Sequence, residues 1–597
     1  MHRRALGVAV RAGSFGALAA VVTATSLVPP ASAAPSRPAP AHLYTLTVKG
    51  VNLGGHPDTG DGVLLLDVDN TKLLDPVESQ QKFHDGVAKF SVPAGHYFAL
   101  GGFGTVKIHG QPAQATRYVV LPQFTVAGNT TVTMRAASAS SKVTMVTPRP
   151  ARVLTTDVWL RRTGASGPPL LLELYPPGRS VWISPTRVKP TVGTLQVSAN
   201  QHLESPRGRA VPYEYTLSFT DPPGTIPVQH YAVPARDLAT IHERFYQPVT
   251  STGGWAFNGS FPGFNANNNN EWFGFIEPAG PALKLPGRLT EYAGGAGSAR
   301  MEWGGQYSPF HSVPSTLGET RLLRPGEHLT DNWSAYPLHP GVNALLTTLP
   351  NMFWMSGANI PSAVRTGNTL QLEVDPFDDN QPGHQIGEVA PTGPDKTAGS
   401  YQVDQNGVKI ASGDAVAAAK FGAFYTTATL SPKPSTIRFA LNYTRTSKDF
   451  PLSTATRTVW AFRSAPVTTS AQLPAGWSCV RYTYKPKGCA AQPMMTLDYA
   501  VAHLGLDGAA PAGPQAVHLT VGHLQTVKAA PVTTVAVAVS FDGGKTWHRA
   551  TVTGGDGNYT AAFSAPAGAK VSLRTRAADA AGGSIAETIT SAYQIGG

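Results

Sequence analysis

The chain has 597 residues, which is too long for one hydrophobic core and favours several domains. Charged residues make up only 14% of it, while 61 glycines and 51 prolines place turn signals every few residues. The formal net charge of +11 is mild for this length, and the sequence has no Lys/Arg cluster interleaved with aromatic residues, so it gives no support to nucleic-acid binding.

The local pattern along the chain is that of β-strands. Apolar repeats with the 3.6-residue helical period are almost absent, whereas short runs rich in Val, Thr and Tyr alternate with turns. The expected fold class is all-β, in the form of a multidomain chain of β-sandwiches.

Residues 1–33 have the three parts of a secretory signal peptide. A positive region with Arg3 and Arg4 precedes an apolar region at 17–28 and an A-x-A cleavage signal at 31–33. We expect a secreted, extracellular protein, and the arginine pair leaves the twin-arginine route open beside general secretion. After cleavage no apolar run approaches the length of a membrane-spanning helix, so no membrane span is predicted.

The first domain is predicted over residues 42–137, after a Pro-rich linker at 34–41. Residues 43–50 alternate between apolar and polar, and Pro93-Ala94-Gly95 separates two strand-like runs, the second of which is aromatic. This pattern resembles the prealbumin-type or carboxypeptidase-regulatory module, which implies a small β-sandwich.

The second predicted domain, residues 138–305, is β-rich and contains the densest aromatic region of the chain. Its rings stand among Gly, Asn and Pro, an arrangement that suits stacking against a sugar or a peptide. The alternative is that the rings fill the end of a β-sandwich. The candidate ligand-binding residues are Trp255, Phe257, Phe264, Trp272 and Phe273.

Four glutamates in the same region, Glu243, Glu271, Glu291 and Glu302, keep a glycoside hydrolase open as an alternative. That reaction uses two carboxyl groups about 5 to 10 Å apart, a distance that the sequence does not determine. His242-Glu243 lacks the second histidine of an H-E-x-x-H zinc motif, and we interpret it as a surface pair at the start of a strand.

The third predicted domain, residues 306–468, carries most of a family resemblance. The stretches are GRLTEYAGG, RPGEHLTDNWSAYPLHPG, RTGNTLQLEVDPFDDNQPGHQIG, GSYQVDQNGVKI and LSTATRTVWAFRS. They resemble the β-rich, non-catalytic region downstream of the protease domain in large secreted subtilisin-like serine proteases of actinobacteria.

The catalytic motifs of that family are missing from the sequence. It has no H-G-T, G-T-S-M or G-x-S-x-G motif, and the predicted linker leads directly into the regulatory-like domain. A nucleophilic serine needs a base and an oxyanion hole, which usually leave such a signature. The resemblance therefore implies the accessory region without its protease domain, and we expect no enzymatic activity.

Asp375, Asp378 and Asp379 form a candidate Ca²⁺ site. Calcium takes clustered carboxylate and carbonyl oxygens from short loops, although the spacing here is not that of an EF-hand. The alternative is a polar turn at the end of a strand. The sequence indicates no other cofactor.

Residues 469–514 are predicted to form a disulfide loop followed by a linker. Cys479 and Cys489 are the two cysteines of the chain. In an oxidising compartment we expect them to close one loop, because a metal site would need more ligands nearby.

The last predicted domain, residues 515–597, has the evenly spaced strands of an immunoglobulin-like sandwich. Within it, residues 535–552 predict a hairpin whose turn contains Asp542-Gly543-Gly544. Residues 540–547 match the S-x-D-x-G-x-T-W pattern called the Asp-box, in which the aspartate bonds backbone amides of the turn. We assign it a structural role.

The sequence as a whole predicts a secreted, non-catalytic β-sandwich protein that binds extracellular protein or polysaccharide. Two alternatives stay open: a secreted hydrolase with an unrecognised site, and a structural component of the cell surface.

Overall fold

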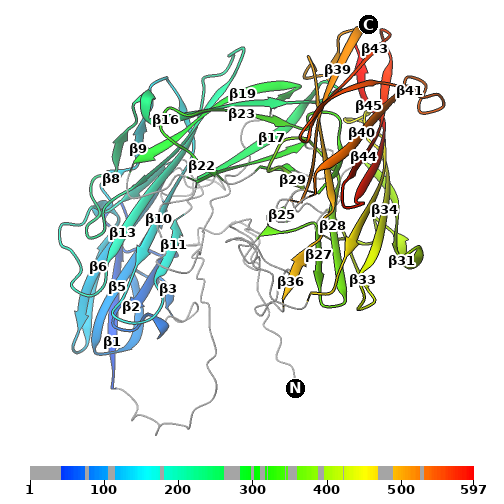
Figure 1. The fold of residues 1–597 in the computed structure, drawn as a ribbon. Coiled ribbons are helices and arrows are strands. Elements are labelled where there is room, and N and C mark those ends of the chain that lie inside the picture. The colour runs from blue at the N-terminus through cyan, green and yellow to red at the C-terminus, as the bar shows by residue number, and fades with distance from the viewer. Residues whose placement is uncertain are drawn as a thin grey trace.

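The computed structural model describes residues 42–73, 79–104, 115–174, 180–260, 283–296, 302–309, 316–318, 321–342, 345–346, 359–386, 395–420, 423–467, 488–524 and 530–597. Within these ranges the regular structure is β, apart from 3-10 turns at Thr71–Leu73, Ala136–Ser138 and Ala235–Asp237. The predicted all-β class is confirmed. Figure 1 shows the blue and cyan strands of the N-terminal part on one side and the yellow to red strands of the C-terminal part on the other, with green strands between them.

The N-terminal strands form a sandwich. Their bounds are β1 (Leu43–Val51), β2 (Gly62–Asp67), β3 (Gln80–Lys82), β4 (Val87–Pro93), β5 (Gly95–Gly104), β6 (Ala115–Val126), β7 (Thr130–Arg135), β8 (Ser141–Lys142) and β12 (Ser180–Ile183). A three-stranded sheet, β4-β1-β7, packs on a six-stranded sheet, β3-β2-β5-β6-β12-β8. Because successive side chains of a strand point to opposite faces, Val63 and Leu65 enter the core of this sandwich, whereas Leu64 and Leu66 enter a second core.

That second core lies between the six-stranded sheet and a seven-stranded sheet. The additional strands are β9 (Thr144–Val146), β10 (Arg152–Arg162), β11 (Leu170–Leu174), β13 (Leu195–Glu204), β14 (Tyr213–Thr220), β15 (His230–Ala232), β16 (Leu238–Phe245), β19 (Gly287–Ala296) and β23 (His328–Trp333). The seven-stranded sheet has the order β11-β10-β13-β14-β19-β16-β23, and β9 and β15 form a small parallel pair. Apolar residues of both large sheets meet in this core, among them Phe98, Leu160 and Leu217.

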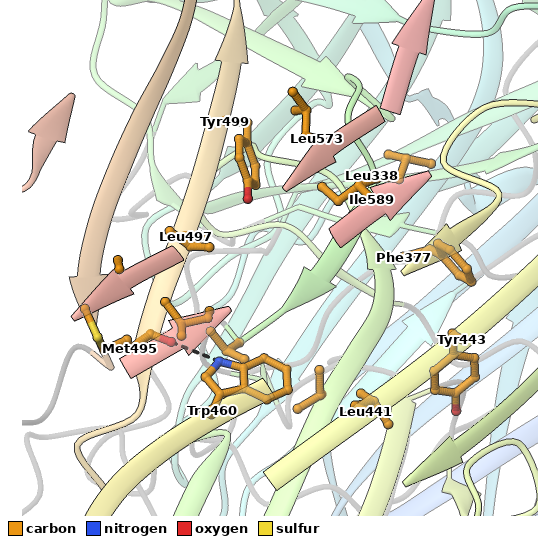
Figure 2. Packing of buried hydrophobic residues seen from close by; sticks show 14 of the residues in the cluster. Leu338, Phe377, Leu441, Tyr443, Trp460, Met495, Leu497, Tyr499, Leu573 and Ile589 are labelled. Carbon is orange, nitrogen blue, oxygen red and sulfur yellow. Dashed lines mark hydrogen bonds between the residues drawn. The ribbon is translucent and has the colours of Figure 1, made fainter. Parts of the chain in front are cut away.

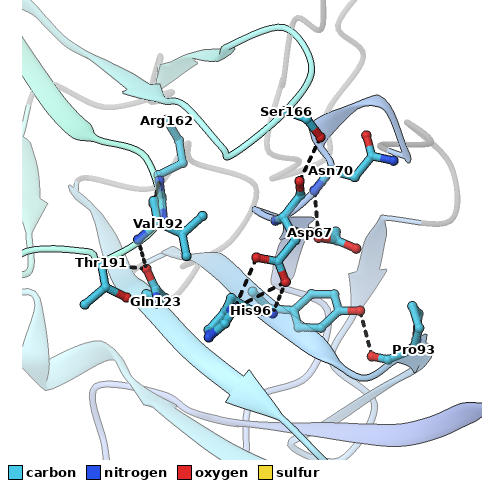
Figure 3. Close-up of polar contacts among 11 residues, drawn as sticks. Asp67, Asn70, Pro93, His96, Gln123, Arg162, Ser166, Thr191 and Val192 are labelled. Carbon is cyan, nitrogen blue, oxygen red and sulfur yellow. Dashed lines mark hydrogen bonds and ion pairs between the residues drawn. The ribbon is translucent and has the colours of Figure 1, made fainter.

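Polar contacts also connect the first two predicted domains (Figure 3). Ser166 donates its hydroxyl to the backbone carbonyl of Asp69, at 2.8 Å, and the Asp69 carboxylate lies 3.1 Å from Nδ1 of His96. The side-chain carbonyl of Gln123 accepts the backbone N–H groups of Thr191 and Val192, at 3.0 and 2.9 Å. Since β12 is a member of the six-stranded sheet, the sheets do not divide at the predicted boundary of 137/138.

Two further sheets stand in the middle of the chain. Their strands are β17 (Ser251–Ser260), β18 (Leu283–Leu285), β20 (Glu302–Pro309), β21 (Thr316–Leu317), β22 (Arg321–Leu322), β24 (His339–Gly341), β25 (Leu345–Leu346), β26 (Asn359–Ile360), β27 (Ala363–Thr366), β28 (Thr369–Asp378), β29 (Gln385–Ile386), β32 (Ala419–Lys420), β33 (Ala423–Thr429) and β36 (Cys489–Ala491). One sheet runs β18-β17-β20-β21-β29, with β22 beside β20, and the other runs β32-β33-β28-β27-β36, with β24 beside β28. β25 and β26 pair with each other.

The C-terminal part is a large two-layer sandwich. Its strands are β30 (Lys396–Gln405), β31 (Val408–Asp414), β34 (Ser435–Thr446), β35 (Ala455–Ser464), β37 (Met495–Val501), β38 (Ala509–Ala510), β39 (Gly513–His523), β40 (Val532–Ser540), β41 (His548–Arg549), β42 (Thr551–Gly555), β43 (Asn558–Ala565), β44 (Lys570–Asp579) and β45 (Ser584–Ile595). A nine-stranded sheet runs β31-β30-β34-β35-β45-β44-β40-β41, with β38 beside β45, and a four-stranded sheet runs β37-β39-β43-β42.

One hydrophobic core joins these strands across the third and last predicted domains. It contains buried residues from Tyr336 to Ile595, and Figure 2 shows Trp460 of β35 within it, donating its indole N–H to the carbonyl of Met495 at 3.2 Å. The predicted linker before residue 515 contributes β38 and the start of β39. The boundary expected at 514/515 therefore falls inside a strand, because Gly and Pro residues here shape short strands rather than a flexible connection.

The predicted hairpin at 535–552 is shorter than expected. β40 pairs with β41 over only two residue pairs, and β42 then pairs with β43 in the other sheet. The Asp-box turn between β40 and β41 forms as predicted, since Asp542 accepts the backbone N–H groups of Lys545 and Thr546, both at 2.9 Å. The chain changes sheets after β41, between Arg549 and Thr551.

Candidate functional site

The seven-stranded sheet has one apolar face and one face that is rich in buried polar residues. On β13, Val197, Ala199 and Leu203 enter the core shared with the six-stranded sheet, and the alternate residues, such as 198, 200 and 202, point the other way. Trp159, Ile241 and Leu289 also lie on this side of the sheet, but most of the side chains there are polar and buried. We call these polar residues the polar sheet face: Asp157, Gln196, Ser198, Asn200, His202, Glu204, Glu214, Thr216, Ser218, Thr220, Glu243, Glu291 and Asp331.

Hydrogen bonds on this face run from strand to strand. The amide of Asn200 donates to Oδ2 of Asp157, at 3.0 Å, which connects β13 to β10. Nε2 of His202 lies 2.8 Å from Oε2 of Glu214, across β13 and β14.

The same pattern continues along β14. Thr220 donates its hydroxyl to that of Ser198, at 3.0 Å, and Thr216 donates to Oε1 of Glu291, at 2.6 Å. The second bond joins β14 to β19. Each of these four bonds joins two neighbouring strands, so the polar side chains are paired across the sheet.

Two of the four predicted glutamates lie on this face. In the antiparallel pair of β16 and β19, Glu243 is opposite Leu289 and Glu291 is opposite Ile241. The two glutamates are therefore diagonal neighbours, and such positions are about 7 to 8 Å apart, with a somewhat shorter distance between the Cβ atoms. Glu243 is buried, so the interpretation of His242-Glu243 as a surface pair is wrong for the glutamate; only His242 is exposed.

Glu243 links the polar sheet face to β28. The indole N–H of Trp333 donates to its carboxylate, and the Trp333 ring stacks on that of His384 with 4.2 Å between centroids. Nδ1 of His384 lies 3.0 Å from the carboxylate of Asp379, which also accepts the backbone N–H of Ser334 at 2.7 Å. Sequence reasoning did not connect these residues.

The predicted calcium ligands Asp375, Asp378 and Asp379 lie at the end of β28 and are buried rather than solvated. Burial, together with the nearby carboxylates of Asp375 and Asp379, raises the pKa of Asp378 well above its usual value. Among the residues that the structure describes, no three His, Cys, Asp or Glu side chains form a group suited to a metal ion. The arrangement gives the calcium hypothesis no support.

Other candidates lie partly or wholly outside the described residues. Trp255 and Phe257 belong to β17, whose backbone alone is described at these positions, and the same holds for Glu302 in β20. Phe264, Glu271, Trp272 and Phe273 lie outside the described ranges. Cys489 is disulfide-bonded, and its predicted partner, Cys479, also lies outside them.

Comparisons with known proteins do not assign a family. No protein-family model matches the chain, and no curated protein matches it. Within the described part of the chain, the helical segments are too short and too polar to cross a membrane.

Three solved structures show a distant likeness. The major pilin subunit BcpA of Bacillus cereus matches with 9% identity and a TM-score of 0.10, covering 49% of this chain and 99% of its own. A Streptococcal ancillary pilin matches with 11% identity and a TM-score of 0.11 over the same shares. The Escherichia coli alpha-2-macroglobulin activated by porcine elastase matches with 8% identity and a TM-score of 0.13, covering 90% of this chain and 50% of its own. Scores this low carry no functional argument.

Proposed function

We propose that this protein is a secreted, non-catalytic β-sandwich protein that binds an extracellular polysaccharide through the polar sheet face. The observation that supports the proposal is the chemistry of that face. Where a sandwich normally buries apolar side chains, this sheet buries amides, hydroxyls, an imidazole and carboxylates. Departures of this kind from apolar packing concentrate at functional sites.

A polysaccharide matches these groups. Each sugar hydroxyl both donates and accepts hydrogen bonds, so a surface that mixes amides and hydroxyls with acceptor-only carboxylates can bind several sugars in a row. The contacts from Asn200 to Asp157 and from His202 to Glu214 fix the side chains before a ligand arrives, which lowers the entropy lost on binding. The resemblance to protease accessory regions supports a role in binding rather than catalysis.

Because these side chains are buried, the face must open before a polymer reaches it. We therefore expect slower association than is typical of preformed sites. A combined glycan and peptide array probed with the labelled mature protein tests the choice of ligand. Binding to one or more polysaccharides is expected; binding to peptides alone would reject the proposal.

A second candidate is a glycoside hydrolase, favoured by the diagonal placement of Glu243 and Glu291. Inverting enzymes hold their two carboxyl groups about 6.5 to 9.5 Å apart. If the protein is such an enzyme, the mature protein releases reducing ends from a polysaccharide, and Glu243→Gln or Glu291→Gln abolishes the release. Glu204→Gln, on the same face but ion-paired with Arg152, is the matched control. If the wild-type protein releases no reducing ends from any polysaccharide that it binds in the array, the hydrolase candidate is rejected.

A further inference from the structure

The outer face of the nine-stranded sheet is strongly basic. Its inner face belongs to the hydrophobic core, with Phe439, Trp460 and Leu573 from β34, β35 and β44. The alternate residues point outward, and six of them are arginines. We call this surface the arginine face: Arg438, Arg457, Arg463, Arg549, Arg574 and Arg576.

The cross-strand register aligns three of these arginines. Arg457 of β35 and Arg574 of β44 are both opposite Thr588 of β45, while Ala538 of β40 is opposite both Arg574 and Arg549. Along this row an arginine therefore lies on every second strand. Because neighbouring strands are about 4.8 Å apart, the arginines are roughly 10 Å apart.

The spaces between the arginines are filled by small side chains. Ala461, Ser584 and Ala578 share one row, and Val459 and Ala586 share the next. The sheet surface between the arginines is therefore flat, and the long arginine side chains project from it. Arg457, Arg463, Arg549 and Arg576 are exposed, and Arg574 is half-buried because its guanidinium lies 3.9 Å from the ring centroid of Trp547.

Few acidic groups balance this charge. On the outward face, Asp404 of β30 forms an ion pair with Arg438 at 3.2 Å, and Asp414 of β31 accepts the backbone N–H groups of Val416 and Ala417 at the sheet edge. Glu587, on β45 between the arginine strands, points into the core instead. The central part of the face therefore keeps an uncompensated positive potential.

We propose that the arginine face binds a linear, carboxylate-bearing polysaccharide, such as a polyuronate. The planar guanidinium matches a carboxylate with two parallel hydrogen bonds, and a flat row of regularly spaced cations matches a chain with regularly spaced anions. Proteins that bind single-stranded nucleic acids stack the bases on open aromatic rings, whereas the one ring placed here, Trp547, is covered by Arg574. This surface is separate from the polar sheet face, so the inference does not depend on that proposal.

The test measures binding of the mature protein to polygalacturonate, with its fully methyl-esterified, uncharged form as the ligand control. A triple variant, R457A/R463A/R576A, removes three exposed cations. The matched control, K89A/K142A/R207A, removes three exposed cations from other surfaces and gives the same net charge. All substituted side chains point outward, and an unchanged melting temperature checks that both variants are folded.

We expect the wild-type protein to bind polygalacturonate with an affinity that falls as salt rises, and not to bind the methyl ester. The arginine-face variant should lose at least about tenfold in affinity while the control variant loses less than about twofold. Equal losses in both variants, or equal binding of the methyl ester, would overturn the proposal. It would also fail if anionic vesicles or single-stranded DNA bound in an arginine-face-dependent way while polygalacturonate did not.

Discussion

His339 and Glu587 form a buried ion pair between β24 and β45, with 3.3 Å between Nδ1 and Oε1. Glu587 also accepts the hydroxyls of Tyr499 and Thr458, at 2.9 and 2.8 Å. The pair therefore ties β24, which lies beside β28 in a middle sheet, to the last strand of the C-terminal sandwich. It adds to the hydrophobic core that joins the third and last predicted domains into one body.

Removing the carboxylate should destabilise this body strongly. In Glu587→Ala, His339 stays buried without its counter-charge, and breaking such a pair costs about 3 to 5 kcal/mol. Chemical denaturation of the wild type and the variant measures the loss. Lys570→Ala, an exposed change on the adjacent strand β44, is the control and should change the free energy of unfolding by less than about 0.5 kcal/mol. A similarly small effect of Glu587→Ala would show that the pair is not important for folding.

Stability should fall as pH rises. Burial alone would lower the pKa of His339, but the adjacent Glu587 carboxylate outweighs it, so the pKa of His339 is raised, as is that of Asp378 through burial and neighbouring carboxylates. In both cases the folded protein holds protons that the unfolded chain releases. The proton on Asp378 contributes fully to the free energy of unfolding below about pH 4, and the proton on His339 does so below about pH 6.5. Each contribution is lost as the pH rises through the pKa that the group has in the folded protein.

Melting temperatures measured from pH 5 to pH 8 check this sign. We expect a decrease across the range for the wild type and a smaller decrease for Asp378→Asn, which keeps the shape of the side chain but cannot ionise. If the wild type became more stable towards pH 8, the assignment of protons to these two groups would be wrong.

The core around Trp460 should be sensitive to a change in volume. The ring is fully buried, stacks on Phe439 with 5.0 Å between centroids, and its N–H is hydrogen-bonded (Figure 2). Trp460→Ala should cost about 3 to 5 kcal/mol through lost burial and a residual cavity. Val408→Ala, at a side chain that is 67% exposed, serves as the control in the same unfolding experiment. Comparable losses from the two substitutions would contradict the packing described.

The Asp-box turn depends on one carboxylate. Hydrogen bonds from the hydroxyl and backbone N–H of Thr546, and from Ser540, hold the pKa of Asp542 below its usual range. Asp542→Ala should therefore speed hydrogen exchange at the amides of Lys545 and Thr546 without affecting the core strands. Unchanged exchange at these two amides would mean that the turn is maintained by its glycines alone.

Much of the fold class could be predicted from local pattern, but the domain divisions could not. The alternation in β1 and in β40 gives strands directly. Which sheets share a core depends on pairings between distant strands, such as β6 with β12 and β35 with β45, and these leave no local signal. Gly508 and Pro514 suggested a linker in the sequence. Turn residues, however, occur both in flexible connections and beside short, tightly packed strands, so they do not distinguish the two.

The candidate site was harder to predict from the sequence than the domain divisions. Alternating polar residues on β13 predict a strand with one solvated face, and nothing in residues 196–204 alone distinguishes this from a buried polar face. Glu243 and Glu291 were singled out by residue type, but only the register of β16 and β19 puts them side by side. The arginine face depends in the same way on register, since its arginines are spread from residue 438 to residue 576.

The most direct test of the central claim compares two neighbouring amides of β13. Asn200, on the polar sheet face, bonds Asp157, whereas Gln201, on the opposite face, bonds the hydroxyl of Thr156 and the carbonyl of Val143. Each alanine substitution removes a buried amide and should lower stability by about 1 to 3 kcal/mol. Titration calorimetry with a polysaccharide bound by the wild type should show affinity lost in Asn200→Ala and retained in Gln201→Ala. Equal affinity of the two variants would contradict binding on the polar sheet face.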